Sequence, residues 1–171
     1  MNIYADRVAQ LREIMVSNGW DAVVLYGTDP HSSEYPAPRW KQVEWLTGFT
    51  GEAGDLVVTH DHAGLWTDSR YFIQAATQLE GTGVELHKTR MPDSVYIPQW
   101  LAENGVEVVA VDGLCVDSAT ADEIVAATSV QADATTNKLC KAIENFSDLY
   151  NIDVDSDKDG SVGKLQKVFS R

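Results

Sequence analysis

The chain has 171 residues, 44% of them hydrophobic, which is enough for one well-packed domain but not for a second of ordinary size. Its 26 acidic and 13 basic residues give a formal net charge of −13, which repels nucleic-acid phosphates and anionic lipid. The first 17 residues mix charges into their apolar positions, unlike a signal peptide or a membrane span. We therefore expect a cytoplasmic protein that binds neither nucleic acid nor membranes.

Helical and strand patterns alternate along most of the chain. The first half of the chain predicts a helix through residues 8–15 that Asn18 and Gly19 end, a strand at 21–26, a proline-rich loop at 27–39 and helical turns at 42–46. Strands at 55–59 and 64–67 follow, joined by a polar hairpin loop. The remaining elements are a helix at 70–79, a strand at 84–86, a helix at 95–104, a strand at 106–111 and a helix at 118–127 that Ser118 caps.

This alternation predicts a layered α/β fold, and the hairpin favours a mixed β-sheet flanked by helices. We expect four aromatic residues to be buried in its core: Trp45, Phe49, Trp66 and Phe72. The predicted α/β domain covers residues 1–137, and residues 138–171 form a helix and an acidic tail. The two cysteines, Cys115 and Cys140, lack the spacing of a metal site, and we expect reduced, buried thiols.

Polar residues crowd into the loop after the first predicted strand, in the segment DPHSSEY at positions 29–35. Ligands of open α/β sheets usually bind at the carboxyl ends of strands, so this segment is a candidate substrate site. The alternative is a turn whose polar side chains bind their own backbone, which the local sequence favours. A Ser-His-Asp triad using Ser32 or Ser33 with His31 is disfavoured, because neither serine has the flanking glycines of a nucleophile turn.

Two other groups of residues could carry chemistry, although a structural interpretation is favoured for each. His60 and His62 could begin a metal site, but no further ligand is visible nearby and a solvated turn is favoured; His87 has no obvious partner. Asp68 or Ser69 can cap the helix that follows them. Arg70 could bind a carboxylate of a ligand, while a salt bridge within the chain is the more usual outcome.

The acidic tail matches most of the calcium loop of an EF-hand between residues 155 and 166. Carboxylates stand at the first, third and fifth positions, in Asp155, Asp157 and Asp159, and Gly160 supplies the sharp turn. Gln166 replaces the final bidentate glutamate, so we expect weak Ca²⁺ binding at most. A disordered acidic extension remains an equal alternative.

The segment at 29–35 resembles the first signature of the cytosolic-type Xaa-Pro aminopeptidases of the creatinase/prolidase family. Further segments agree with this family in order and spacing: WLTGFTG at 45–51, AG at 53–54, and LWTDSRYF at 65–72 with QAA at 74–76. Residues 108–113 are similar to a later strand of the family. The resemblance covers residues 1–127.

The resemblance implies a creatinase/prolidase N-terminal α/β domain set before a separate "pita-bread" catalytic domain. That second domain binds two divalent metals, usually manganese, which activate water to hydrolyse the peptide bond before proline. It does not fit into 171 residues, so we expect no cofactor in this chain besides weak Ca²⁺, and no catalysis by the chain alone. The expected partners are the chain's own C-terminal catalytic domain, peptide substrates and further copies in a homo-oligomer.

Glu34 is the residue that the resemblance most directly implies in substrate binding, by helping to hold the free amino terminus of a peptide. We expect His31, Tyr35 and Arg70 to contribute to the same role. The chain departs from the family at residues 142–146, where an apolar segment leading to a W-x-D-R-P-like junction is replaced by the approach to the acidic tail.

Two functions therefore remain open. The chain is either the non-catalytic domain of a longer aminopeptidase, shaping substrate access and oligomer contacts, or a stand-alone binding module with a calcium-responsive tail. The intact mass of the natural gene product would separate them.

Overall fold

A computed structural model describes residues 2–128 of the chain. The predicted domain boundary after residue 137, the terminal helix, Cys140 and the calcium positions Asp155, Asp157 and Asp159 lie outside the described residues. No helix within residues 2–128 is both long enough and apolar enough to cross a membrane.

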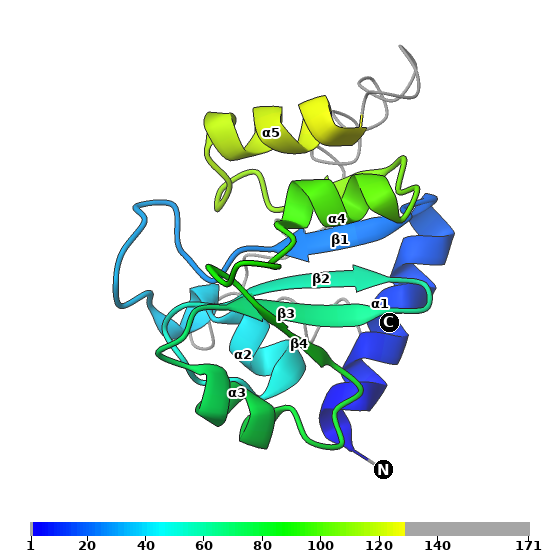
Figure 1. The fold of residues 1–171 in the computed structure, drawn as a ribbon. Helices are drawn as coiled ribbons and strands as arrows, with labels where there is room; N and C mark the ends of the chain where they lie inside the picture. Colours follow the sequence, from blue (N-terminus) through cyan, green and yellow to red (C-terminus); the bar gives the residue numbers. More distant parts are fainter. Residues whose placement is uncertain (1, 129–171) are drawn as a thin grey trace.

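The centre of the described domain is a five-stranded sheet in the order β4-β3-β2-β1-β5 (Figure 1). Its strands are β1 (Ala22–Leu25), β2 (Asp55–Thr59), β3 (Ala63–Thr67), β4 (Glu85–Lys88) and β5 (Val109–Val111). β2 pairs antiparallel with β1 and β3, whereas β1 pairs parallel with β5 and β3 with β4. The predicted mixed sheet is therefore confirmed.

Helices cover both faces of the sheet and give a three-layered α/β domain (Figure 1). The helices are α1 (Ile3–Asn18), the 3₁₀ turn η1 (Pro38–Trp40), α2 (Gln42–Thr47), α3 (Phe72–Gln78), α4 (Ile97–Glu103) and α5 (Ser118–Thr128). Side chains of α1, α2 and α3 share one hydrophobic core with the sheet, and side chains of α4 and α5 share the other.

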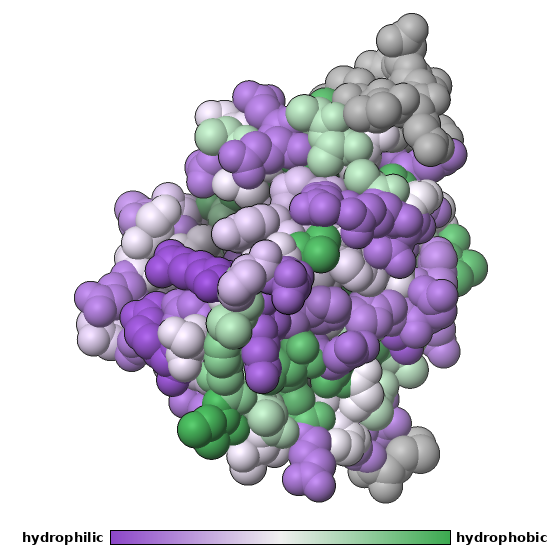
Figure 2. Space-filling model, in the orientation of Figure 1, coloured by the Kyte–Doolittle hydropathy of each residue, from purple (hydrophilic) through white to green (hydrophobic). Residues whose placement is uncertain are grey.

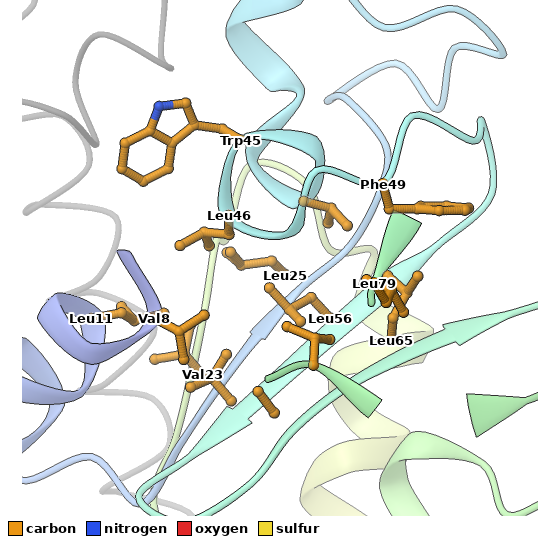
Figure 3. Close-up of a cluster of buried hydrophobic side chains, with 14 of the residues drawn as sticks. Val8, Leu11, Val23, Leu25, Trp45, Leu46, Phe49, Leu56, Leu65 and Leu79 are labelled. Atoms are coloured by element: carbon orange, nitrogen blue, oxygen red, sulfur yellow. The ribbon is translucent and has the colours of Figure 1, made fainter. Parts of the chain in front are cut away.

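The alternation of side chains along β1 explains how one strand serves both cores. Val23 and Leu25 join the core under α1, α2 and α3, which Figure 3 shows, whereas Ala22 and Val24 join the core under α4 and α5. All four residues are buried. A strand buried on both faces reads as a continuous apolar run, which is why the sequence predicted it.

Three of the four predicted core aromatics are buried: Phe49 and Trp66 are almost inaccessible, and Trp45 is only slightly less so. Phe72, the first residue of α3, is only partly buried, and Nζ of Lys88 lies 5.2 Å from the centroid of its ring.

Two helix starts differ from the prediction. The helix α3 begins at Phe72, not at residue 70, and neither Asp68 nor Ser69 caps it; the N-cap position is Tyr71, with no side-chain hydrogen bond. Ser118 is already the first helical residue of α5, and Asp117 takes the capping role predicted for Ser118 by accepting the N–H of Thr120 at 2.8 Å. The capping prediction was wrong by one residue there, within the usual uncertainty of helix ends.

The predicted strand at 106–111 is shorter in the structure, because its first residues close the end of α4. The N–H of Val106 donates to the carbonyl of Leu101, and the Asp21 carboxylate accepts the N–H groups of Glu107 and Val108. Only Val109–Val111 pair with β1. Pro98 lies in the first turn of α4, where its missing N–H costs no helical hydrogen bond.

Candidate functional site

A cavity of about 300 Å³ opens where β1, β3 and β4 end, the carboxyl edge of these strands. We refer to it as the carboxyl-edge cavity. Polar and ionisable residues line much of it, among them Tyr26, Asp55, Asp68, Arg90 and Cys115.

Asp55 is the most perturbed carboxyl group of this cavity. Burial raises its pKa to about 6, and the N–H of Gly27, which donates to Oδ1 at 3.0 Å, only partly opposes that rise. Burial and the nearby Asp55 also raise the pKa of the Tyr26 phenol, which therefore stays protonated. Cys115 is a buried thiol whose pKa is raised by burial, so this predicted environment is confirmed and the thiol is a poor nucleophile.

A second cavity, of about 150 Å³, adjoins the first, and Gly27 and Gly54 line both. A Cβ atom on Gly27 would collide with the backbone carbonyl oxygen of Gly54. The two chain segments therefore approach each other so closely that only glycine fits at position 27. We call the second cavity the Glu34 pocket.

The Glu34 pocket has an acidic rim and an aromatic wall. Three carboxylates line it, from Glu34, Glu44 and Glu52, against one ammonium group, that of Lys41. Lys41 pairs with Glu44 at 3.3 Å, which leaves the pocket with a negative excess. Its aromatic lining residues are Tyr35, Trp40 and Phe49. Such a pocket suits a cationic group carried on an apolar or ring-shaped body.

The loop at 29–35 is built around Asp29. Its buried Oδ1 accepts the N–H groups of His31 at 2.9 Å and Ser33 at 3.0 Å, and these bonds hold the pKa of Asp29 below its usual range. The turn interpretation is therefore confirmed for Asp29. His31, Glu34 and Tyr35 are exposed, and Glu34 and Tyr35 turn out to line the same pocket.

Arg70 lies apart from these residues and lines neither cavity. Its guanidinium group binds the Asp68 carboxylate with contacts of 2.8 and 3.0 Å, and this partner lowers the pKa of Asp68. The structural salt bridge that the sequence favoured is confirmed.

The structure brings together His62, Glu85 and His87, which the sequence did not connect. The ring of His62 lies beside His87, with 3.1 Å between the two Nε2 atoms, and Glu85 lies next to both. His87 thus has partners, contrary to the prediction, and burial lowers the pKa of its ring. His60 is exposed, as expected for a turn. Nothing local in the sequence signalled this cluster, because 25 residues separate the two histidines.

The fold is similar to solved structures of peptidases and of their isolated N-terminal domains. The X-prolyl aminopeptidase of Caenorhabditis elegans, described as a cytosolic enzyme with a di-nuclear active site, is 32% identical and superposes with a TM-score of 0.67 over 75% of this chain and 23% of its own. An N-terminal domain of a metallopeptidase from Corynebacterium diphtheriae, 18% identical, superposes with a TM-score of 0.56 over 75% of this chain and 91% of its own. The fold is that of the N-terminal α/β domain of such peptidases.

Within that class, the model of the Creatinase/Prolidase N-terminal domain matches residues 7–143, and the chain belongs to this family. Its relatives include a probable Xaa-Pro aminopeptidase P of Pyricularia oryzae, 42% identical over 68% of this chain, and aminopeptidase P1 of Arabidopsis thaliana, 38% identical over 67%. The matched part of the chain spans 19% and 18% of the length of these relatives. The family that the sequence resembled is therefore confirmed.

Proposed function

We propose that this chain is the amino-terminal domain of a cytoplasmic, di-metal Xaa-Pro aminopeptidase, where it shapes substrate access and contributes oligomer contacts. In this proposal the Glu34 pocket receives the cationic amino terminus of the peptide. The observation that carries it is the pocket itself, which combines an exposed Glu34 with a second acidic side chain, Glu52, and an aromatic wall.

The magnitude of this interaction defines its role. An exposed ion pair contributes about 0.2–1 kcal/mol, which favours the correct end of a peptide without performing chemistry. Aromatic rings beside the pair add area for the side chain or proline ring of the ligand. Tyr71, whose hydroxyl donates to Glu52 at 3.4 Å, helps to hold that carboxylate in place. Tyr35 lines the pocket and His31 is exposed on the same loop, so both would contact the peptide. Arg70 already binds Asp68.

The two metals of the enzyme, Mn²⁺ in this proposal, do not fit the residues described here. Within residues 2–128, the one group of metal-ligating side chains close enough to share an ion is His62, Glu85 and His87. Three ligand atoms are too few for a pair of ions, and in this proposal the di-metal centre lies in the C-terminal catalytic domain.

Replacing Glu34 by glutamine should weaken the binding of a short peptide that has a free amino terminus and proline as its second residue. We expect a loss of roughly 1.5- to 5-fold in affinity, because one weak ion pair is removed. The measurement is a chemical-shift titration of the chain by NMR, with the N-acetylated peptide as the ligand control. Glu80→Gln, at an exposed position beyond α3, is the matched control variant. Equal affinity for the free and acetylated peptides would refute the role of the pocket.

The isolated chain should not hydrolyse Xaa-Pro peptides when Mn²⁺, Co²⁺ or Zn²⁺ is added. The reason is the ligand count given above, together with the absence of a second metal position among the described residues. The measurement is turnover of a proline-containing peptide before and after repurification. Activity that stays with the chain through repurification would contradict this assignment.

A further inference from the structure

The strand register gathers His62, Glu85 and His87 on one face of the sheet. β3 and β4 run parallel, with Gly64 opposite Glu85 and Trp66 opposite His87. Side chains two residues apart on a strand share a face, so Glu85 and His87 point the same way from β4. His62 stands two residues before Gly64, at the end of the hairpin turn, and reaches over the same face.

Gly64 provides the space in which these side chains meet. A Cβ atom at this position would lie 2.7 Å from Nε2 of His62 and 2.7 Å from Cδ2 of His87. Real Cβ atoms do not approach other atoms so closely, so any larger residue would push the imidazole rings apart. The absent side chain of Gly64 is thus what allows the two rings to converge over β3.

Aromatic rings fix the orientation of the two histidines. Trp66 stacks on His87, with 3.8 Å between ring centroids and an interplanar angle of 10°. Trp100 of α4 lies against His62, with centroids 4.9 Å apart. Both imidazoles are partly buried under these rings, whereas Glu85 is exposed and can rotate. The imidazole nitrogens of His62 and His87 are therefore held in place, whereas the Glu85 carboxylate can move to bind an ion.

The distances suit a small ion with tetrahedral coordination. Two imidazole nitrogens bound to one Zn²⁺ lie about 3.3 Å apart, given Zn–N bonds of about 2.0–2.1 Å. The Nε2 atoms of His62 and His87 are 3.1 Å apart, and the ligand atoms of all three residues lie within 4.8 Å of one another. Two imidazoles and a carboxylate favour a borderline transition metal over Ca²⁺ or Mg²⁺, which prefer oxygen ligands only.

We propose that His62, Glu85 and His87 form a binding site for one divalent transition-metal ion of the Zn²⁺ type. Three protein ligands leave one position open to water, so the ion would exchange rather than be permanently enclosed. The ion would also join the edge strand β4 to the β2–β3 hairpin turn and stabilise this edge of the sheet.

The test is calorimetric titration of the full chain with ZnCl₂, with excess Mg²⁺ present to occupy oxygen-only sites. We expect one Zn²⁺ bound per chain and a higher melting temperature with the ion. His62→Gln and His87→Gln should each lower the affinity by at least about tenfold and remove the thermal shift. The matched control is His60→Gln, which removes an exposed imidazole from the same turn and should leave both readouts unchanged.

Circular dichroism of each variant confirms that it is folded before the titration is interpreted. The proposal is overturned if the wild-type chain takes up no Zn²⁺ under these conditions. It is equally overturned if folded His62→Gln and His87→Gln bind the ion as tightly as the wild type, since the 3.1 Å contact is then only a hydrogen bond between the two rings.

Discussion

Replacing Trp66 by alanine should lower the free energy of unfolding by about 3–5 kcal/mol, among the largest effects expected from a single substitution in this domain. The ring is 3% exposed, and it packs in the core that α4 and α5 form with the sheet. Its indole N–H donates to the carbonyl of Val95 at 2.9 Å. The substitution therefore leaves a cavity in the core, and it removes the donor that binds the carbonyl group of Val95.

Thermal unfolding of the wild type and the variant measures this effect, and we expect the melting temperature to fall by roughly 10 °C or more. Ile73→Ala is the matched control, because it truncates an apolar side chain that is 86% exposed on α3. Figure 2 shows hydrophobic residues, in green, at the surface where α3 lies, which agrees with the exposure of this side chain. A Trp66→Ala variant that melts with the wild type would contradict the central position of this ring.

Replacing Asp55 by asparagine should stabilise the domain above neutral pH and have little effect in acid. The folded-state pKa of Asp55 is raised from 3.8 to about 6, so the folded chain binds this proton more tightly than the unfolded chain does. Stability contributed by this group is therefore present below pH 3.8 and is lost as the pH rises through about 6. Asparagine has no charge to bury and can still accept the N–H of Gly27.

We expect a gain of about 1–3 kcal/mol near pH 8, which follows from a shift of about two pKa units. Urea unfolding at about pH 4 and about pH 8 measures it. Asp93→Asn removes one negative charge at an exposed position and controls for the change in net charge. If Asp55→Asn were destabilising at both pH values, the carboxylate would be a stabilising acceptor and not a buried charge.

The sequence predicted the fold well where a segment carries its own signal. The apolar run at 22–25 and the hairpin around 60–62 lie where they were expected, because burial on both faces and a polar turn are local patterns. Val106 and Val108 share the apolar character of β5, but Val106 closes the end of α4 and Val108 donates its N–H to the carboxylate of Asp21. Asp21 also accepts the N–H of Glu107, which lies 86 residues further along the chain. No local pattern contains that contact.

At the candidate sites, too, the sequence predicted single residues but not the residues that the fold brings beside them. The sequence marked Glu34 as a surface residue of a functional loop, but Glu44 and Glu52 joined it in one pocket only through the folding of α2 and the loop that follows. The pair of His62 and His87 depends on the register of β3 against β4, and on the missing side chain of Gly64. Spacing along the chain cannot express either arrangement, because each depends on which strands become neighbours.

The parallel pairing of β1 with β5 also dictates the order in which the domain can assemble during synthesis. β1 and its antiparallel partner β2 are complete by Thr59, but β5 begins about 50 residues later, at Val109. At translation rates of roughly 5–20 residues per second, these strands emerge several seconds apart. The core under α1 and α2 can therefore begin to form while the other face of β1, with Ala22 and Val24, still lacks its covering helices. During that interval one edge and one face of β1 lack their partners, which leaves them open to chaperone binding or to aggregation.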